Sequence, residues 1–385
     1  MKFLLITEIF PPKIGGSGRW FWEIYSRLAA DTYIVAAGCD PLANEHDAMQ
    51  NLNCLRWPLT FNSWGIASVP SVKSYCKLFN LLRDAVKSRN IESIHCGRAL
   101  PEGLLGWMSW KWFGIPYLCY VHGEELPTYH SSREYKFLSQ LVYSNAHRVI
   151  VNSENTRKSF LAHTGIAHSV RVMHPGVDID FFRHQEPNGD MRRQLQWHDK
   201  KVILTVGRLQ KRKGHDHLIL ALNFIREHIP DVLYVIVGEG EEQDSLEKLV
   251  TSESLQEHVL FAGKVDDATM LACYQHCDLF VLANREVDGD FEGFGMVLLE
   301  AQACGKPVIA GKSGGTSETM IPGETGLLVD ADKPEDIADA IVQLLGDRER
   351  LREMGERAQE WVRENFDWRV LTVQAENIFS ELNQR

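Results

Sequence analysis

The chain alternates short apolar runs with longer amphipathic segments from one end to the other, and this alternation restricts the fold more than any other feature. Continuous apolar runs of this length are typical of parallel strands buried on both faces, and the segments between them are typical of helices. The expected strands lie at residues 3–6, 33–36, 93–95, 117–121, 148–151, 170–173, 202–206, 233–237, 259–261, 279–282, 308–309 and 326–329. The pattern predicts an α/β protein with two parallel sheets.

The length of 385 residues exceeds that of one ordinary domain and predicts two or three. The expected seam is the stretch 174–178, which reads His-Pro-Gly-Val-Asp and precedes a polar tract. We therefore expect one α/β domain at 1–177, a second at 178–365 and a closing helix at 366–385.

Composition indicates a soluble globular protein, with 44% hydrophobic and 24% charged residues. No apolar run reaches the roughly 18–20 residues that are needed to cross a bilayer. The nearest, 104–121, is interrupted by a lysine, a glycine and a proline. The apolar start of the chain meets an acidic residue and two prolines, so we expect a first strand there and not a secretory signal.

Eight cysteines are scattered without a Cys-x-x-Cys pair, which favours reduced thiols in a cytosolic protein. Cys273 and Cys277 share a helical face with His276 nearby and could bind a metal, but buried thiols are the favoured interpretation. No metal site is predicted.

The net charge of −11 is unevenly distributed. Residues 1–175 hold 18 Lys and Arg against 13 Asp and Glu, a net charge of +5, and the remainder carries −16. An acidic second half argues against a nucleic-acid partner, whereas the basic first half could approach an anionic surface.

A glycine-rich loop, Gly15-Gly16-Ser17-Gly18, follows the first expected strand and precedes a helical segment at 19–28. Glycines there allow main-chain amides to approach a phosphate, although a tight turn is the favoured explanation of a lone glycine loop. The spacing is not that of the dinucleotide motif, which lowers the case for an NAD enzyme.

Two cations, Arg208 and Lys213, follow the first expected strand of the second half, next to Gly207 and Gly214. Ligands of open α/β sheets bind at the carboxyl ends of the strands, and an arginine with a lysine suits a diphosphate. The alternative is a solvated basic turn at 211–213.

Two acids, Glu292 and Glu300, bracket a helix expected to open at Gly295. The free amides of a helix start attract an anion, while carboxylates accept hydrogen bonds from hydroxyl groups. This arrangement suits a sugar diphosphate, although an ordinary amphipathic helix can also carry an acid at each end.

His122 ends the strand at 117–121 and could reach a bound sugar or phosphate, although an isolated histidine is more often structural. The segment 72–89 combines basic residues with an apolar stripe and could bind an anionic membrane, or it could be a helix with a solvated basic face. The basic residues proposed for membrane contact are Lys73, Lys77, Arg83 and Lys87.

Together these motifs resemble the retaining nucleotide-sugar glycosyltransferases of family 4 over nearly the whole chain. The resemblance implies the GT-B fold, with two facing Rossmann-like domains. The first, 1–177, would bind the acceptor and the second, 178–365, the nucleotide sugar. The helix at 366–385 would cross back onto the first domain.

The resemblance also implies residue roles. Arg208 and Lys213 would neutralise the leaving nucleotide and, with His122 at the donor sugar and Glu292 at its hydroxyls, form the catalytic set. Glu300 would hold the ribose. The donor-binding set is Gly15, Gly16, Gly207, Val265, Asp267, Phe294, Gly295, Met296, Val297 and Glu300.

Within the family, the stretches 265–269 and 288–293 look most like phosphatidylinositol mannosyltransferases, which use GDP-mannose. A carboxylate at Asp267 could accept hydrogen bonds from both the ring N–H and the amino group of guanine. GDP-mannose is therefore the expected donor.

We expect a metal-independent retaining hexosyltransferase, without a cofactor, that moves mannose to a lipid-linked or glycan acceptor. It would be cytoplasmic and peripherally associated with the inner, anionic membrane face. The alternatives are a UDP-sugar-dependent transferase, a nucleotide-sugar epimerase or sugar phosphorylase of the same fold, and a non-catalytic nucleotide-sugar-binding module.

Overall fold

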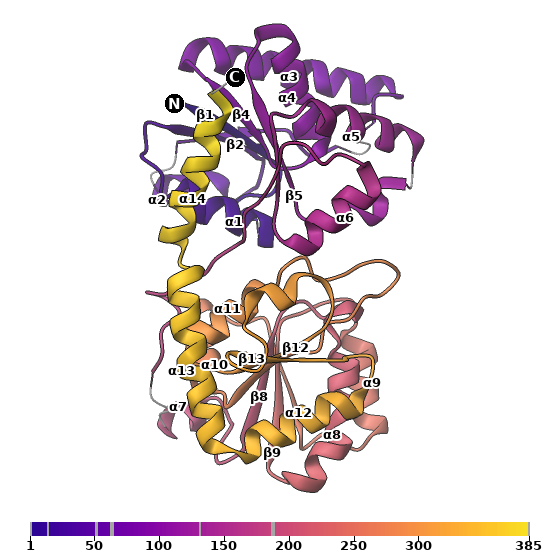
Figure 1. The fold of residues 1–385 in the computed structure, drawn as a ribbon, viewed down its shortest axis with the longest axis vertical. Coiled ribbons are helices and arrows are strands. Elements are labelled where there is room, and N and C mark those ends of the chain that lie inside the picture. Colours follow the sequence, from indigo (N-terminus) through magenta and orange to yellow (C-terminus); the bar gives the residue numbers. More distant parts are fainter. Residues whose placement is uncertain are drawn as a thin grey trace. The chain divides into compact units, whose positions relative to one another are not determined.

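The structure is a computed structural model that describes residues 2–13, 15–50, 53–61, 65–130, 132–185 and 189–383. The chain divides into two compact units (Figure 1). The first unit runs to Pro175 and also includes the chain from Trp368 onward, and the second is Gly176–Asp367. The limits expected from the sequence are residues 177 and 365.

A seven-stranded parallel sheet forms the centre of the first unit, in the order β3-β2-β1-β4-β5-β6-β7. Its strands are β1 (Phe3–Thr7), β2 (Tyr33–Gly38), β3 (Cys54–Trp57), β4 (Ser93–Cys96), β5 (Tyr117–Val121), β6 (Arg148–Val151) and β7 (Val170–Val172). Its helices are α1 (Gly16–Tyr25), α2 (Ala43–Gln50), α3 (Val69–Arg89), α4 (Leu104–Phe113), α5 (Arg133–Asn145), α6 (Glu154–Thr164) and α14 (Trp368–Ser380), with shorter helical turns at Ala99–Gly103, Pro127–His130 and Glu381–Asn383.

Helix ends in the first unit follow local capping rules. The side chains of Ser68, Ser132 and Ser153 each accept a hydrogen bond from the main-chain N–H three residues later, at the starts of α3, α5 and α6. Helices α4 and α6 stop at Gly114 and Gly165, both with φ of +70°, a conformation that glycine adopts without strain.

Helix α14 closes the first unit by packing against α1 (Figure 1). Phe379 of α14 stacks on Tyr25 of α1, with ring centroids 5.8 Å apart, and its ring lies 4.4 Å from that of His95 on β4. Beyond α14, Glu381 accepts a hydrogen bond from Arg148 Nε at 2.9 Å. Stacked rings and an ion pair thus attach the end of the chain to the sheet.

The second unit has a six-stranded parallel sheet in the order β10-β9-β8-β11-β12-β13. Its strands are β8 (Lys201–Val206), β9 (Val232–Val237), β10 (Val259–Gly263), β11 (Leu279–Leu282), β12 (Val308–Gly311) and β13 (Gly326–Val329). Its helices are α7 (Gly189–Gln194), α8 (His215–His228), α9 (Gln243–Ser252), α10 (Asp267–His276), α11 (Met296–Ala303), α12 (Pro334–Gly346) and α13 (Arg348–Asn365), with 3-10 turns at Lys211–Lys213 and Gly314–Thr319.

Both sheets reverse their strand order at one point, between β1 and β4 in the first unit and between β8 and β11 in the second. In open parallel sheets, the helices on either side of such a reversal lie on opposite faces, which leaves a crevice at the carboxyl ends of the strands. The fold therefore places a candidate ligand site in each unit.

The prediction of two parallel sheets is confirmed, and all twelve expected strands are present. The sequence analysis missed β3, because a charged residue interrupts this short edge strand. Arg56 pairs there with both carboxylate oxygens of Asp47 and donates to the main-chain oxygens of Gly38 and Pro11. The first helix also begins three residues earlier than expected, at Gly16.

His95 in the first unit and His215 in the second are buried histidines that contact a tyrosine hydroxyl. His95 Nδ1 lies 2.5 Å from the Tyr25 hydroxyl, and His215 Nδ1 lies 2.9 Å from the Tyr234 hydroxyl. Burial lowers the pKa of His95 from 6.5 to about 3 and is the main cause that lowers the pKa of His215 to about 4. Both imidazoles are therefore neutral in the folded protein at neutral pH.

Because these two histidines are neutral in the folded protein, we expect its stability to fall in acid. Below pH 6.5 the unfolded chain binds protons that the folded chain excludes, so the free energy of unfolding should fall by about 1.4 kcal/mol per pH unit for each histidine. His95→Gln should weaken this pH dependence in urea unfolding between pH 7.5 and 5, and His215→Gln should weaken it separately in the second unit. An unchanged slope in both variants would contradict the assignment.

Candidate functional site

The crevice of the second unit lies where β8 and β11 end. Gly207 follows β8, and its loop touches the loop that follows β9. A Cβ atom at Gly238 would lie 2.0 Å from the Gly207 oxygen, and one at Gly240 would lie 2.4 Å from the Leu209 oxygen. No side chain fits such gaps, and Gly238 also has a φ of +137°. The glycines are therefore required for the main-chain arrangement at this edge of the sheet.

A buried carboxylate, Glu292, lies at the centre of this edge and is 9% exposed. Lys213 Nζ lies 2.5 Å and Arg212 Nη1 2.7 Å from the same oxygen, Oε2. Burial alone would raise the pKa of Glu292, but the two cations outweigh burial and hold the pKa below its ordinary value. The carboxylate is therefore ionised at neutral pH, with one oxygen held by both cations.

The main chain of Arg212 is held in place by Arg285, which lies in the loop after β11. The N–H of Arg285 donates to the Arg212 oxygen at 2.9 Å, and the guanidinium of Arg285 forms two hydrogen bonds, of 2.7 and 2.6 Å, with Asp216 of α8. Arg285 is 7% exposed and the Asp216 side chain is 27% exposed, so this bidentate pair is partly shielded from water. Arg212 also forms an ion pair with Asp290 at 3.1 Å.

Helix α11 begins directly after this cluster. Gly295 precedes its first residue with a φ of +97°, and no side chain caps the helix, so its first-turn amides have no side-chain acceptor. The helix was expected to open at Gly295 and begins one residue later, at Met296. Phe294 is buried. Within α11, the buried Glu300 accepts a hydrogen bond from the Tyr274 hydroxyl at 2.6 Å.

The structure brings some predicted residues of the second unit together and separates others. Lys213 and Glu292 are in contact, Gly207 lies beside the Lys213 side chain, and Gly295 lies beside Glu292. Arg208 is exposed, and its side chain makes no hydrogen bond or ion pair with any residue that the structure describes. An exposed, unpaired guanidinium at this edge can bind an anion.

Val265 and Asp267 follow β10, two strands away from β8. The preceding residue, Asp266, caps α10 by accepting a hydrogen bond from the Thr269 N–H at 2.8 Å. Asp267 is exposed in the first turn of α10, and Val265 and Val297 are half-buried. Of the two adjacent acids, Asp266 therefore has a structural role, and the carboxylate of Asp267 extends into solvent.

In the first unit, His122 follows β5. Its Nε2 lies 2.9 Å from the Gly97 oxygen, which can only accept, so Nε2 carries a proton, and in the neutral ring Nδ1 is an acceptor. The ring packs edge-on against Trp20 and Phe21 of α1, with centroids 5.5 Å away in both cases. Two aromatic residues that follow the glycine loop thus pack against this histidine.

Gly15 precedes α1, which begins at Gly16, and no side chain caps the helix. A Cβ atom at Gly18 would lie 3.1 Å from the Ile9 oxygen, so α1 lies close to the end of β1. Close packing thus accounts for Gly18. Gly15 has an extended conformation that other residues also adopt, but a Cβ atom there would lie 3.0 Å from Ile9 Cγ2, so close packing accounts for Gly15 as well.

Sequence reasoning missed an acidic cluster at the reversal point of the first unit. Glu102 is fully buried, accepts a hydrogen bond from the Glu8 N–H at 2.9 Å and lies 3.8 Å from Arg98. Burial raises the pKa of Glu102 despite that cation. No sequence pattern distinguishes Glu102, because only the fold of the turn after β4 buries it.

The basic helix is α3, and its apolar stripe is covered. Tyr75, Leu78 and Leu82 are at most 4% exposed and belong to the core of the first unit. The four predicted cations, Lys73, Lys77, Arg83 and Lys87, are exposed. These three residues therefore cannot insert into a membrane, and the accessible surface of α3 is its basic face together with Val69 and Val72 at the start of the helix.

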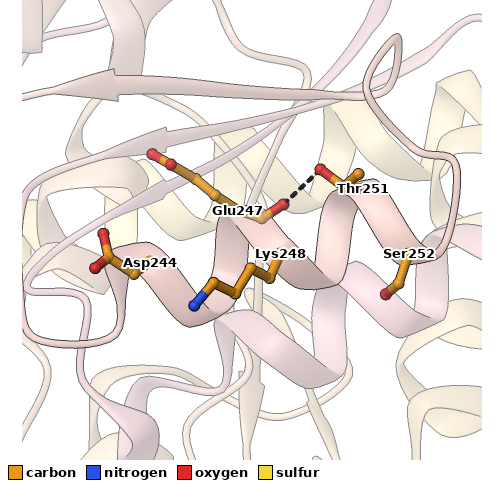
Figure 2. A pocket seen from close by; sticks show the side chains of 5 residues that line it. All are labelled: Asp244, Glu247, Lys248, Thr251 and Ser252. Carbon is orange, nitrogen blue, oxygen red and sulfur yellow. Dashed lines mark hydrogen bonds between the residues drawn. The ribbon is translucent and has the colours of Figure 1, made fainter.

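Across the described part of the chain, no helix is both long and apolar enough to span a bilayer, and no cluster of three metal-binding side chains is present. Figure 2 shows a hollow along α9, lined by Asp244, Glu247, Lys248, Thr251 and Ser252. None of the predicted site residues lines this hollow. In the figure Thr251 donates to the Glu247 main-chain oxygen at 3.0 Å, a bond within the helix.

Two known protein families match the chain, one over each half. The family described as Glycosyltransferase Family 4 matches residues 14–181, and the family described as Glycosyl transferases group 1 matches residues 188–361. Together the two matches include all the predicted site residues.

Curated relatives match along almost their entire length. The chain is 30% identical over 379 residues to a GDP-mannose-dependent alpha-(1-6)-phosphatidylinositol monomannoside mannosyltransferase of Mycolicibacterium smegmatis, covering 95% of both chains. It is 27% identical over 384 residues to a related enzyme of Corynebacterium glutamicum, which acts on the monoacylated lipid, covering 98% of this chain and 97% of that one.

Solved structures agree on the fold. HepE of Anabaena, determined in complex with UDP, superposes with a TM-score of 0.83 at 23% identity and covers 99% of this chain and 100% of its own. Sucrose-phosphate synthase of Thermosynechococcus elongatus gives a TM-score of 0.80 at 25% identity, with 99% of both chains covered. The expected resemblance is confirmed: the chain belongs to glycosyltransferase family 4 and has the GT-B fold.

Proposed function

We propose that the protein is a retaining mannosyltransferase that uses GDP-mannose and transfers mannose to a lipid-linked or glycan acceptor. The observation that carries this proposal is the ionised Glu292 at the crevice of the second unit, held by Lys213 beside an uncapped helix start. Cations and helix amides donate hydrogen bonds to the oxygens of a diphosphate, and a buried carboxylate accepts hydrogen bonds from sugar hydroxyls. The GDP-mannose dependence of the curated relatives supports the choice of donor.

Each group at this edge has a role in the proposal. The exposed Arg208 and the mobile ammonium of Lys213 bind the diphosphate, together with the amides of Phe294, Gly295 and Met296. The free oxygen of Glu292 accepts hydrogen bonds from the sugar hydroxyls. In the remaining positions, Glu300 holds the ribose, Val297 lines the nucleotide, and Val265 and Asp267 hold the base.

The first unit contributes the groups at the carboxyl ends of β1 and β5. We propose that Gly15 and Gly16 bind the diphosphate through their amides. The acceptor nitrogen Nδ1 of His122 would take a hydrogen bond from a hydroxyl of the donor sugar, since Nε2 already donates to Gly97. The protein thereby contacts the sugar without forming a covalent bond to it.

The proposed reaction proceeds on one face of the sugar. The bond between the anomeric carbon and the diphosphate oxygen breaks, and its electron pair stays on the phosphate. The acceptor oxygen attacks the same face, and its proton passes to the departing phosphate oxygen. Arg208 and Lys213 stabilise the charge that develops on that phosphate, which is the largest electrostatic demand of the step.

A lipid-linked acceptor requires access to a membrane. We propose that Lys73, Lys77, Arg83 and Lys87 on the exposed face of α3 attract the anionic cytoplasmic leaflet. Because the apolar stripe of α3 is buried, this contact would be electrostatic and peripheral. The association should therefore weaken as salt screens the charges.

Removing either diphosphate-binding cation should slow transfer. Arg208→Ala or Lys213→Ala is expected to lower kcat/KM by about two to four orders of magnitude, because each removes a contact that strengthens as the leaving group gains charge. Lys211→Ala, an exposed neighbour, is the matched control and should stay near the unmodified value. Near-normal turnover in either test variant would contradict the assignment.

The base preference tests the donor. GDP should bind more tightly than UDP by about 1–3 kcal/mol, because guanine offers two donors to one carboxylate and uracil offers one. Asp267→Ala should abolish this preference in calorimetry. Asp266→Asn retains the helix cap and removes an adjacent charge, so it should preserve the preference. Equal affinity for the two nucleotides in the unmodified protein would instead favour a UDP-sugar donor.

Membrane binding should depend on where the charges lie. Each cation near an anionic surface contributes roughly 1 kcal/mol, so replacing Lys73, Lys77 and Lys87 with Glu should abolish sedimentation with anionic liposomes and leave donor hydrolysis intact. The control replaces three exposed cations of α5 and α6, Arg133, Lys136 and Lys158, with Glu. Loss of sedimentation in both variants would show that only net charge matters.

A further inference from the structure

Two cations share one oxygen of Glu292, and they differ in how firmly they are held. Arg212 contacts Glu292 and Asp290, and its main-chain oxygen accepts from Arg285. Lys213 contacts Glu292 alone among the described residues, at 2.5 Å. The side chain of Arg212 thus contacts two carboxylates and that of Lys213 one.

The side chains also differ in chemistry. The guanidinium of Arg212 is planar and contacts two carboxylates, those of Glu292 and Asp290. The main chain of Arg212 is held by Arg285, which is itself paired with Asp216. Lys213 is a point charge on a flexible stem, and its Cε atom lies beside Gly207 at the end of β8. The Lys213 side chain can therefore turn toward a ligand in the crevice. The Arg212 side chain cannot move away from Glu292 in the same way without also breaking its contact with Asp290.

A diphosphate that binds at this crevice competes with Glu292 for Lys213. It carries more negative charge than a carboxylate and offers more acceptor oxygens, so the ammonium moves toward it. If Lys213 were the only partner of Glu292, this move would strand a buried carboxylate, which would then take up a proton. A protonated Glu292 would no longer bind sugar hydroxyls as a carboxylate.

We propose that Arg212 is a positioning residue that keeps Glu292 ionised and in place while the nucleoside diphosphate draws Lys213 away. The donor thus exchanges one ion pair for another, and the cluster of Arg212, Asp290, Arg285 and Asp216 stays unchanged. This inference rests on the proposed function, because it requires that a nucleoside diphosphate binds at this edge of the second unit.

Calorimetric titration with GDP, and in parallel with UDP, tests the exchange. Each titration is done at pH 6 and 7.5 in two buffers of different ionisation enthalpy, which reports the number of protons taken up. Arg212→Gln should bind the nucleotide at least tenfold more weakly at pH 7.5, with proton uptake beyond that of the unmodified protein. Arg212→Lys restores the charge and should return both quantities toward those of the unmodified protein.

Two further variants control the interpretation. Asp290→Asn removes one of the two carboxylates that Arg212 contacts and leaves the contact with Glu292, so it should weaken nucleotide binding less than Arg212→Gln and take up fewer protons. Glu292→Gln removes the competitor for Lys213 and should bind the nucleotide at least as tightly as the unmodified protein, which keeps the test available if Arg212→Gln does not fold.

The outcomes separate the two proposals. If Arg212→Gln binds within twofold of the unmodified protein without extra protons, or if Glu292→Gln binds tenfold more weakly, the exchange is refuted while the proposed function stands. If neither GDP nor UDP binds the unmodified protein, both fail. Tenfold weaker binding of Arg212→Gln with proton uptake, rescued by Arg212→Lys, supports the exchange.

Discussion

The candidate site of the second unit depends on one buried carboxylate. Glu292 is nearly inaccessible to water and stays ionised only because Lys213 and Arg212 contact it. Breaking a buried ion pair by removing one partner is strongly unfavourable, so the surrounding structure is arranged to keep Arg212 in place. The β11 end supplies Arg285, α8 supplies Asp216, and the close approach of the β8 and β9 loops depends on glycines.

Most of the fold could be predicted from the sequence, because buried parallel strands have an unambiguous pattern of continuous apolar residues. The exception was β3, where Arg56 interrupts the run and is satisfied by Asp47 and by main-chain oxygens far away in the sequence. Such partners are apparent only in the folded chain. Helix starts were expected to within a few residues, as at Gly16 and Met296, because free helix ends leave several residues with similar local preferences.

The site was predicted in part. Lys213 and Glu292 were named as site residues from separate motifs, and their contact with each other is apparent only in the structure. Arg212 was missed because a run of three basic residues also fits a solvated turn, and only the structure shows that Arg212 and Lys213 are paired with Glu292 while Lys211 is exposed. For the same reason the periodicity of α3 could not show whether its apolar stripe faces a membrane or the core.

A structure of the protein with GDP bound tests the central claim most directly, namely that the charged edge of the second unit binds the donor diphosphate. The account predicts a phosphate oxygen within about 3 Å of both Arg208 and the ammonium of Lys213, a normal distance for a charge-assisted hydrogen bond. Arg212 should remain on Glu292. A diphosphate bound away from this edge, with Lys213 still paired to Glu292, would contradict the account.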